Sequence, residues 1–241
     1  MNIFKRHELK YLITAEQREY IERAISEYMT PDEYGESTIC NIYYDTDNYR
    51  LIRRSIEKPM YKEKLRLRSY GKSADDKTVF LELKKKYDGV VYKRRISLTC
   101  REAVDFMEGK TDLKEDTQIG REIKYFIKYY ETIKPRVYLC YDRTAYFSVT
   151  DRDLRITFDR NILWRRDKLD LRYDHYGTDI LKEGQSLMEI KSGTAMPLWL
   201  VDIINKSGVK RSSFSKYGNA YLSILKDELT ERRGLCNGRV I

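Results

Sequence analysis

The sequence contains few of the residues from which metal clusters, redox centres and nucleophilic sites are built. Among 241 residues there are four cysteines, which form no CxxC pair, and only two histidines. This pattern excludes the usual spacing of a zinc site and predicts reduced thiols. Neither histidine has the sequence neighbours of a catalytic group, so we expect chemistry that needs no protein nucleophile.

Long apolar segments are also missing. No window approaches the roughly 18 consecutive apolar residues that cross a bilayer, and the N-terminal MNIFKRHELK lacks the apolar core of a signal peptide. No Pro, Gly or Ser-rich linker, internal repeat or low-complexity tract divides the chain. We therefore expect one domain over residues 1–241, cytoplasmic and without a membrane span.

Acidic residues are too few to balance the basic ones. Lysine and arginine number 47 against 38 for aspartate and glutamate, which gives a formal net charge of +9. Such an excess predicts an anionic partner, which can be nucleic acid, an acidic membrane surface or a phosphate-bearing small molecule.

Amphipathic helices alternate with strand-like segments. Helical spacing marks residues 14–29, 99–109, 119–133, 198–207 and 214–233, of which the first two begin with capping boxes. Strand chemistry marks eight segments, 4–14, 37–46, 62–71, 77–88, 90–99, 136–149, 154–166 and 186–193. Hairpin-length turns, of which Asp88-Gly89 is the clearest, indicate antiparallel pairing. We predict an α+β fold built on an eight-stranded antiparallel barrel, with helices outside or across its ends.

The polar faces of these strands carry mostly cations. In KLRLR, alternation puts Lys64, Arg66 and Arg68 on one face and Leu65 and Leu67 on the other. The same alternation groups Arg6, Glu8 and Lys10; Glu82 and Lys84; Lys93 and Arg95; Tyr141 and Arg143; Arg155, Thr157 and Asp159; and Glu189 and Lys191. Whether Lys93 or Arg94 belongs to this face stays open, because a bulge after the Asp88-Gly89 turn would exchange them.

The amphipathic helices need an apolar surface to cover, so we expect the apolar strand faces outside and the charged faces in the lumen. Unpaired charges in a dry interior cost several kcal/mol each, which predicts a wet lumen that holds a polyanion such as triphosphate. Carboxylates in the same place are best explained as ligands of Mg²⁺ or Mn²⁺ that bridge to phosphate. Glu189, with Glu8 or Glu82, is the candidate metal site.

Seven motifs in order carry a family resemblance: ELKY, KLRLRSYG, LELKKK, YDRTAY, LRITFD, MEIK and SSFSKY. From about Phe4 to Leu225 the chain resembles the VTC domain, the polyphosphate polymerase branch of the triphosphate tunnel metalloenzymes, or CYTH-like superfamily. The resemblance implies an eight-stranded antiparallel tunnel that the C-terminal helix closes at one end. It further implies a metal-dependent phosphotransferase that moves the γ-phosphoryl of ATP to a growing inorganic polyphosphate chain, with orthophosphate and pyrophosphate as related ligands.

The resemblance and the strand faces together assign site residues. The catalytic set, which would orient the transferring phosphoryl group, is Arg66, Arg68, Lys84, Arg143 and Arg155. The phosphate-binding set is Lys10, Lys93, Tyr141, Lys191, Ser215 and Lys216, the last two at the start of the C-terminal helix. The metal, Mn²⁺ or Mg²⁺, would be held by Glu189, Glu8 and Glu82.

Two other functions stay open. RHELKY has one acidic residue where hydrolytic members of the superfamily show ExExK, which favours a polymerase over a tunnel-type triphosphatase. The hairpin LELKKKYDGVVYKRR, with Tyr87 and Tyr92, is compatible with non-catalytic RNA or polyanion binding. We nevertheless expect no nucleic acid partner, because Glu82 and Glu189 lie on cationic faces. Trp164 and Trp199 are expected to be structural, with stacking on adenine near the tunnel mouth as the alternative for Trp164.

Overall fold

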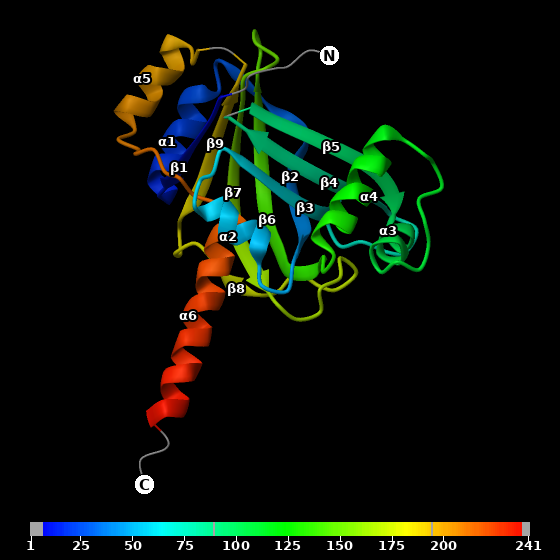
Figure 1. Ribbon diagram of the computed structural model, residues 1–241. Coiled ribbons are helices and arrows are strands. Elements are labelled where there is room, and N and C mark those ends of the chain that lie inside the picture. The colour runs from blue at the N-terminus through cyan, green and yellow to red at the C-terminus, as the bar shows by residue number, and fades with distance from the viewer. Residues whose placement is uncertain (1–6, 89, 194, 238–241) are drawn as a thin grey trace.

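The protein is built around one antiparallel sheet (Figure 1). The computed structural model describes residues 7–88, 90–193 and 195–237. Its hydrogen-bonded strands follow the order β1-β9-β7-β6-β2-β3-β4-β5, and the short β8 pairs with β7. The strands are β1 (His7–Ile13), β2 (Met29–Asp45), β3 (Tyr61–Tyr70), β4 (Thr78–Tyr87), β5 (Val90–Thr99), β6 (Lys134–Ser148), β7 (Arg155–Arg165), β8 (Thr178–Asp179) and β9 (Ser186–Ser192). Each of the eight predicted segments overlaps one of these strands, although β2 begins eight residues before the predicted segment 37–46.

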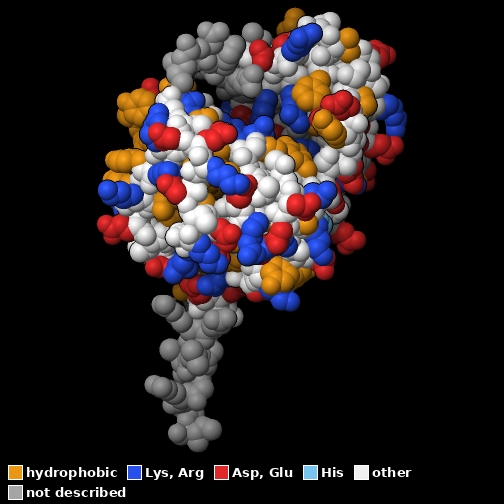
Figure 2. Space-filling model, turned by 90° about the vertical axis from the view of Figure 1, so that its right-hand side faces the viewer, with side chains coloured by type: hydrophobic (Ala, Val, Ile, Leu, Met, Phe, Trp, Pro, Cys, Tyr) orange, Lys and Arg blue, Asp and Glu red, His pale blue; other side chains and the backbone are white. Residues whose placement is uncertain are grey.

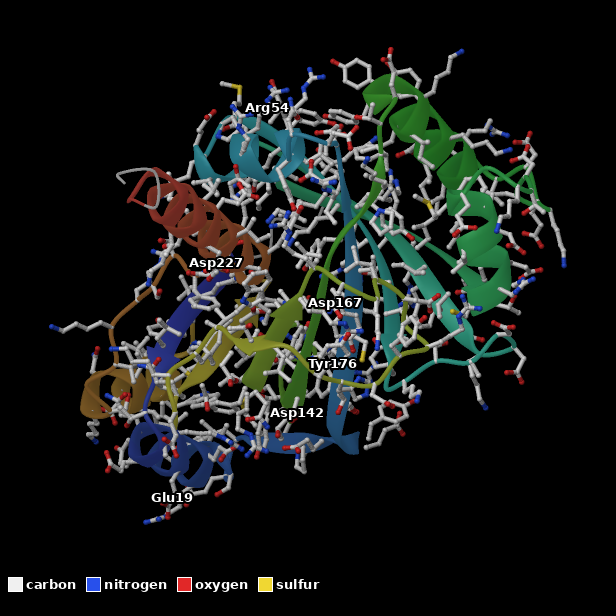
Figure 3. The ribbon with its side chains drawn as sticks, turned by 90° about the horizontal axis from the view of Figure 1, so that it is seen from below. Glu19, Arg54, Asp142, Asp167, Tyr176 and Asp227 are labelled. Carbon is white, nitrogen blue, oxygen red and sulfur yellow. The ribbon has the colours of Figure 1, made fainter. Side chains whose placement is uncertain are left out.

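The sheet curves, so that one of its faces becomes concave. Seen from below, the strands wrap round the centre, with α1 (Ala15–Ile25), on which Glu19 is labelled, on the outside (Figure 3). The two ends of the strand order, β1 and β5, form no backbone pair with each other within the described residues. The predicted α+β class and antiparallel sheet are confirmed, but a continuous hydrogen-bonded ladder does not close the barrel there.

The predicted helices begin close to the expected residues. They are α1, α3 (Cys100–Met107), α4 (Gln118–Tyr130), α5 (Leu198–Lys206) and α6 (Lys216–Asn237). Both capping boxes are present, since Thr14 and Gln17 exchange side-chain to backbone bonds, as do Thr99 and Glu102. These bonds satisfy amide groups that a helix start otherwise leaves without acceptors.

Helices α3 and α4 cover the outer face of β3, β4 and β5. Four leucines of this face, Leu65, Leu67, Leu81 and Leu83, have no exposed surface. They belong to one apolar cluster with Phe106 of α3 and with Ile123 and Phe126 of α4. Removing these side chains from water stabilises the fold by about 1.5–3 kcal/mol each. The alternate residues of the same strands therefore lie on the concave face, as predicted.

Helices α1 and α5 cover the outer face of the other half of the sheet. Ile156 and Phe158 of β7 are fully buried in a second cluster with Ile21 of α1 and Leu200 of α5. Figure 1 shows this helix pair beside β1, β7 and β9, on the opposite side from α3 and α4. The apolar faces of both halves thus point outward, under helices.

The C-terminal helix α6 closes one end of the concave space. Its first turns place Tyr217, Tyr221 and Ile224 against Val137 and Leu187, on the inner face of β6 and β9. Beyond these turns the helix runs away from the sheet (Figure 1). One end of the lumen is consequently apolar and filled, and charged side chains line the remainder.

A short helix that the sequence pattern did not reveal, α2 (Arg50–Ile56), holds α6 in place. The fully buried Asp45 accepts hydrogen bonds from the backbone amides of Leu51 and Ile52, at 2.9 and 3.0 Å. Tyr217 of α6 donates its hydroxyl to the same carboxylate at 2.9 Å. Asp45 therefore joins β2, α2 and α6 at the closed end.

Candidate active site

The concave face collects the residues that strand alternation assigned to it. Cross-strand register pairs Lys10 with Glu189, Arg66 with Glu82, and Arg143 with Asp159. The β4–β5 register is unbroken and pairs Lys84 with Lys93, which puts Lys93 on the inner face. Arg94 points outward, where its Nε lies 3.5 Å from Glu122 of α4. Figure 2 shows lysine and arginine side chains gathered in a hollow of the surface.

A buried cluster of charges joins β6, β7, β9 and α6. The Nζ of Lys216 lies 2.5 Å from Asp159 and 3.1 Å from Glu189, and both carboxylates are almost fully buried. Arg143 donates two hydrogen bonds to Asp159, at 2.6 and 2.7 Å, and approaches Glu189 at 3.9 Å. Burial alone would raise the pKa of Glu189, but Lys216 and Lys10 hold it well below its usual range. The cluster is therefore ionised and fixes the start of α6.

Lys10 links this cluster to the lumen. Its Nζ lies 3.2 Å from Glu8 and 3.4 Å from Glu189, and it donates to the carbonyl oxygen of Phe214 at 3.2 Å. Lys191, on the neighbouring strand, lies 3.7 Å from Glu189. The carboxylates of Glu8 and Glu189 therefore share the ammonium group of Lys10 on the β1–β9 side of the lumen.

A second cluster surrounds Glu82, whose side chain is 1% exposed. Arg66 contacts it through Nε at 2.8 Å and Nη2 at 2.6 Å, and Lys93 contacts it at 2.7 Å. Although burial favours the neutral acid, these cations lower the pKa of Glu82 to about 2. Arg66 also donates to the hydroxyl of Tyr43 at 3.2 Å, so its guanidinium is held on two sides.

Arg68 is oriented by neutral partners. Its Nε donates to the side-chain oxygen of Asn41 at 2.9 Å, and Nη2 donates to the Tyr141 hydroxyl at 3.4 Å. Asn41 is itself fixed by a bond from its amide to the carbonyl of Leu139 at 3.1 Å. Because Glu82 stays 3.9 Å away, the positive charge of Arg68 is only partly neutralised.

Lys64 and Lys84 face each other across β3 and β4 without a carboxylate in ion-pair contact, within the described part of the chain. Lys64 donates a hydrogen bond to the Ser215 hydroxyl at 3.4 Å, and that hydroxyl also accepts from the Gly218 amide. Burial and neighbouring cations lower the pKa of Lys64 to about 7 and of Lys84 to about 8, and for Lys84 the attraction of Glu8 opposes the shift. This part of the lumen therefore has an excess of positive charge.

Arg155 is the catalytic candidate with the loosest contacts. Its closest carboxylate is Asp32, at 3.8 Å, and its guanidinium carbon lies 4.6 Å from the ring centre of Phe147. The buried Nε has no hydrogen-bond partner within the described residues. Arg155 therefore retains a donor for an anion.

The lowered pKa of Lys64 predicts that a polyanion binds together with a proton. At pH 8 a group of pKa about 7 is mostly neutral, and a bound polyanion would restore its ordinary pKa near 10.4. Calorimetry with tripolyphosphate at pH 8, in buffers of different ionisation enthalpy, should show uptake of about one to one and a half protons, because Lys84, with a pKa of about 8, is also partly neutral. Affinity should fall as the pH rises from 7 to 9, and Lys64→Met should weaken both effects. Equal heats in all buffers would contradict this expectation.

The same shift fixes the sign of the stability change in the absence of ligand. Between pH 7 and about 10.4 the unfolded chain holds a proton on Lys64 that the folded chain does not hold. The contribution of Lys64 to the free energy of unfolding therefore rises with pH across this window.

The carboxylates of the lumen could bind a metal ion only together with phosphate groups of a substrate. Among the described residues, no three His, Cys, Asp or Glu side chains are placed to hold an ion by themselves. Mg²⁺ is commonly bound by one or two carboxylates together with substrate phosphates, and Glu8 and Glu189, which meet at Lys10, can supply that share. Glu82 instead has two close cationic contacts, so its predicted metal role has less geometric support.

The outward cations of the β4–β5 hairpin do not form a free basic surface. Lys85 lies 3.3 Å from Glu122, the carboxylate that also approaches Arg94. The inward Lys84 and Lys93 belong to the lumen, so the geometry favours an anion held inside over nucleic acid on the outer hairpin face. Asp88 has the positive φ of 43° that the predicted turn requires, and Gly89 lies outside the described residues, as does Arg6.

Trp164 is 5% exposed and packs in the cluster at the closed end, so it is structural as expected, and the alternative of an adenine contact is wrong. Strict alternation from Asp159 would place it on the outer face. The β6–β7 register shifts near Asn161, which has a φ of 49°, and the following residues change sides.

Three residues that contribute to the site were not among the predicted site residues. Asp159 and Lys64 lie on the predicted faces, and their position alone was a signal that could have selected them. Asn41 stands as one polar residue between apolar neighbours in CNIYY, which is a further signal. Its role depends on the β2–β3 register, which the sequence does not show.

Comparison with known proteins identifies the family. The family model of the VTC domain matches residues 5–225, almost the whole chain. The chain belongs to the VTC domain family. This agrees with the resemblance carried by the seven motifs, and the family match also covers the segments between those motifs.

A curated relative of this VTC domain is the vacuolar transporter chaperone complex subunit 4 of Schizosaccharomyces pombe. The two are 27% identical over 240 residues, an alignment that covers 81% of this chain and 33% of the relative. The chain thus spans about a third of the length of that protein. Among the described residues, no helix is long and apolar enough to span a membrane.

One solved structure supports the fold of the VTC domain, and a second aligns less closely. A Bacillus halodurans protein, provisionally described as an adenylate cyclase, aligns with a TM-score of 0.51 and 13% identity. The alignment covers 88% of this chain and 95% of that protein. A Vibrio parahaemolyticus protein with a similar description aligns with a TM-score of 0.48 and 11% identity, over 90% and 97% of the two chains. At this identity the likeness concerns the fold.

Proposed function

We propose that this VTC domain is a polyphosphate polymerase, which transfers the γ-phosphoryl of ATP to a growing inorganic polyphosphate chain inside the lumen. The observation that carries the proposal is the pair Lys64 and Lys84, which face each other with no carboxylate in ion-pair contact in the described chain, Glu8 acting on Lys84 only from a greater distance. Like charges directly opposite each other destabilise a sheet. A bound row of phosphates would turn this repulsion into attraction.

The residues of the lumen divide into those that hold the site and those that hold phosphate. Lys216, Asp159 and Glu189 satisfy one another and set the position of α6. Arg66 and Arg68 are pre-oriented by Glu82, Tyr43 and Asn41, so they can receive a phosphoryl group with little rearrangement. Such preorganised donors are the main source of rate enhancement in phosphoryl transfer.

The remaining cations could bind the two substrates, the triphosphate of ATP as donor and the polyphosphate chain as acceptor. Lys64, Lys84 and Arg155 have unused donors and would bind the triphosphate and the terminal phosphate of the acceptor. Placing the two in line is the second requirement of the reaction. Lys10, Lys93, Lys191, Ser215 and Tyr141 border this space and would complete the phosphate contacts.

A divalent ion is part of the proposal. Glu189 and Glu8 would hold Mn²⁺ or Mg²⁺ jointly with phosphate oxygens, and Glu82 is the less suited third candidate. When bound, such an ion neutralises charge on the phosphates. Lys10, which contacts both carboxylates, would then turn toward phosphate.

Product analysis tests this function. The purified domain, incubated with ATP and Mn²⁺, should yield ADP together with long-chain polyphosphate on a gel, and EDTA should abolish both products. Orthophosphate alone as the phosphate product would support a tunnel-type triphosphatase, which the same lumen could house. RNA binding that neither ATP nor polyphosphate displaces would support the third alternative.

A further inference from the structure

Three side chains of the inner face form an aromatic and cationic platform on β3, β4 and β5. The ring centres of Tyr70 and Phe80 lie 5.9 Å apart, with an interplanar angle of 82°. The guanidinium carbon of Arg95 lies 4.3 Å from the ring centre of Phe80. Tyr70 is 58% exposed, so much of its ring is accessible to a ligand.

The platform begins where the cationic lining ends. Phe80 is the direct cross-strand partner of Arg68, and Tyr70 follows Arg68 by two residues on the same face of β3. Two strand residues span about 7 Å. This is comparable with the ribose that separates a nucleobase from its first phosphate. Arg95 is likewise the cross-strand partner of Glu82, in the cluster that orients Arg66.

The contacts leave Tyr70 as the ring that is available to a ligand. Arg95 stacks on Phe80, and the rings of Phe80 and Tyr70 meet edge to face, so Phe80 supports Tyr70. An edge-to-face pair is a favoured aromatic arrangement, and the 58% exposure of Tyr70 leaves ring surface for a ligand. Trp164, the other aromatic residue considered for this role, is buried at the closed end.

We propose that the base of a nucleoside triphosphate stacks on Tyr70, with Phe80 and Arg95 as its support, while the phosphates enter the lumen past Arg68. This inference rests on the proposed function and extends it, because it assigns the nucleoside end of the substrate to a site outside the phosphate-binding residues. Stacking recognises the area of a ring more than its hydrogen-bonding edge. ATP and GTP should therefore bind similarly, and both should bind more tightly than CTP or UTP.

A comparison of two ligands tests the platform without turnover. Tyr70→Ala should weaken binding of a non-hydrolysable ATP analogue by about 5- to 100-fold, the scale of one lost stacking contact. Affinity for tripolyphosphate, which has no base, should stay within about twofold. Tyr70→Trp should restore binding of the analogue. Tyr87→Ala, which removes an equally exposed tyrosine from the outer face of β4, is the matched control and should change neither affinity.

Each outcome has one meaning for the platform. A Tyr70→Ala variant that loses equal affinity for both ligands, or for neither, overturns the proposal, as does a wild type that binds ATP no more tightly than tripolyphosphate. Failure of the polymerase proposal has a different readout, since it appears as absence of polyphosphate in the product assay. The ratio of the two affinities, measured with EDTA present, does not depend on that result.

Discussion

Arg66→Ala should lower the turnover number for polyphosphate synthesis about 100-fold or more. Arg66 is oriented toward the lumen by Glu82 and Tyr43, and loss of one preorganised electrostatic contact costs about 3 kcal/mol in the transition state. Steady-state kinetics with ATP and Mn²⁺ would measure the change. Arg66→Lys keeps the charge but loses the two-pronged contact to Glu82, so we expect it to recover only part of the activity.

Arg94→Ala is the matched control for this experiment. Arg94 lies on β5 with its side chain turned to the outer face, where it approaches Glu122. Its removal should leave turnover within about twofold and change stability by less than about 1 kcal/mol. Equal losses of activity in the Arg66 and Arg94 variants would show that net charge, and not the inward position, matters.

Asp159→Ala should cause the largest loss of stability among single substitutions at the site. Asp159 is fully buried and accepts from Arg143 while contacting Lys216, so its removal leaves two buried cations with Glu189 as their one remaining shared carboxylate among the described residues. Breaking a buried ion pair in this way costs about 3–5 kcal/mol. Chemical denaturation would measure the free energy of unfolding of the variant against that of the wild type.

Tripolyphosphate should restore part of this lost stability, because it can neutralise the cations that Asp159 leaves behind. Asp142→Ala serves as the control, since Asp142 accepts from the neutral Thr38 and Asn161 on the outer side. That substitution should cost about 1–2 kcal/mol and show no such rescue. If Asp159→Ala unfolds no more easily than Asp142→Ala, the cluster around Lys216 does not hold α6 as described.

The strand faces were predictable because the apolar face of each strand must pack under the amphipathic helices. Once Leu65 and Leu67 pack under α3 and α4, alternation directs Arg66 and Arg68 inward, and no detail of pairing is needed. The same reasoning correctly located Lys10 and Glu189. Capping boxes likewise fixed the starts of α1 and α3, since they act within four residues.

Features that depend on register or on a local irregularity were not predictable. The shared ammonium of Lys216 follows from where α6 enters the barrel, and no local pattern specifies that position. The register shift near Asn161 reversed the side of Trp164. Helix α2 is only 7 residues long and is held by Asp45 of the preceding strand, so its own periodicity carried too little information.

Helix α6 extends from the charged cluster to the outside of the protein. It is continuous for 22 residues, about 33 Å at 1.5 Å per residue, and its first residue is Lys216 (Figure 1). The ammonium group that balances Glu189 and Asp159 is thus carried by the same continuous helix as a segment outside the sheet. The inner and outer environments of the protein are joined by one secondary-structure element, without a loop between them.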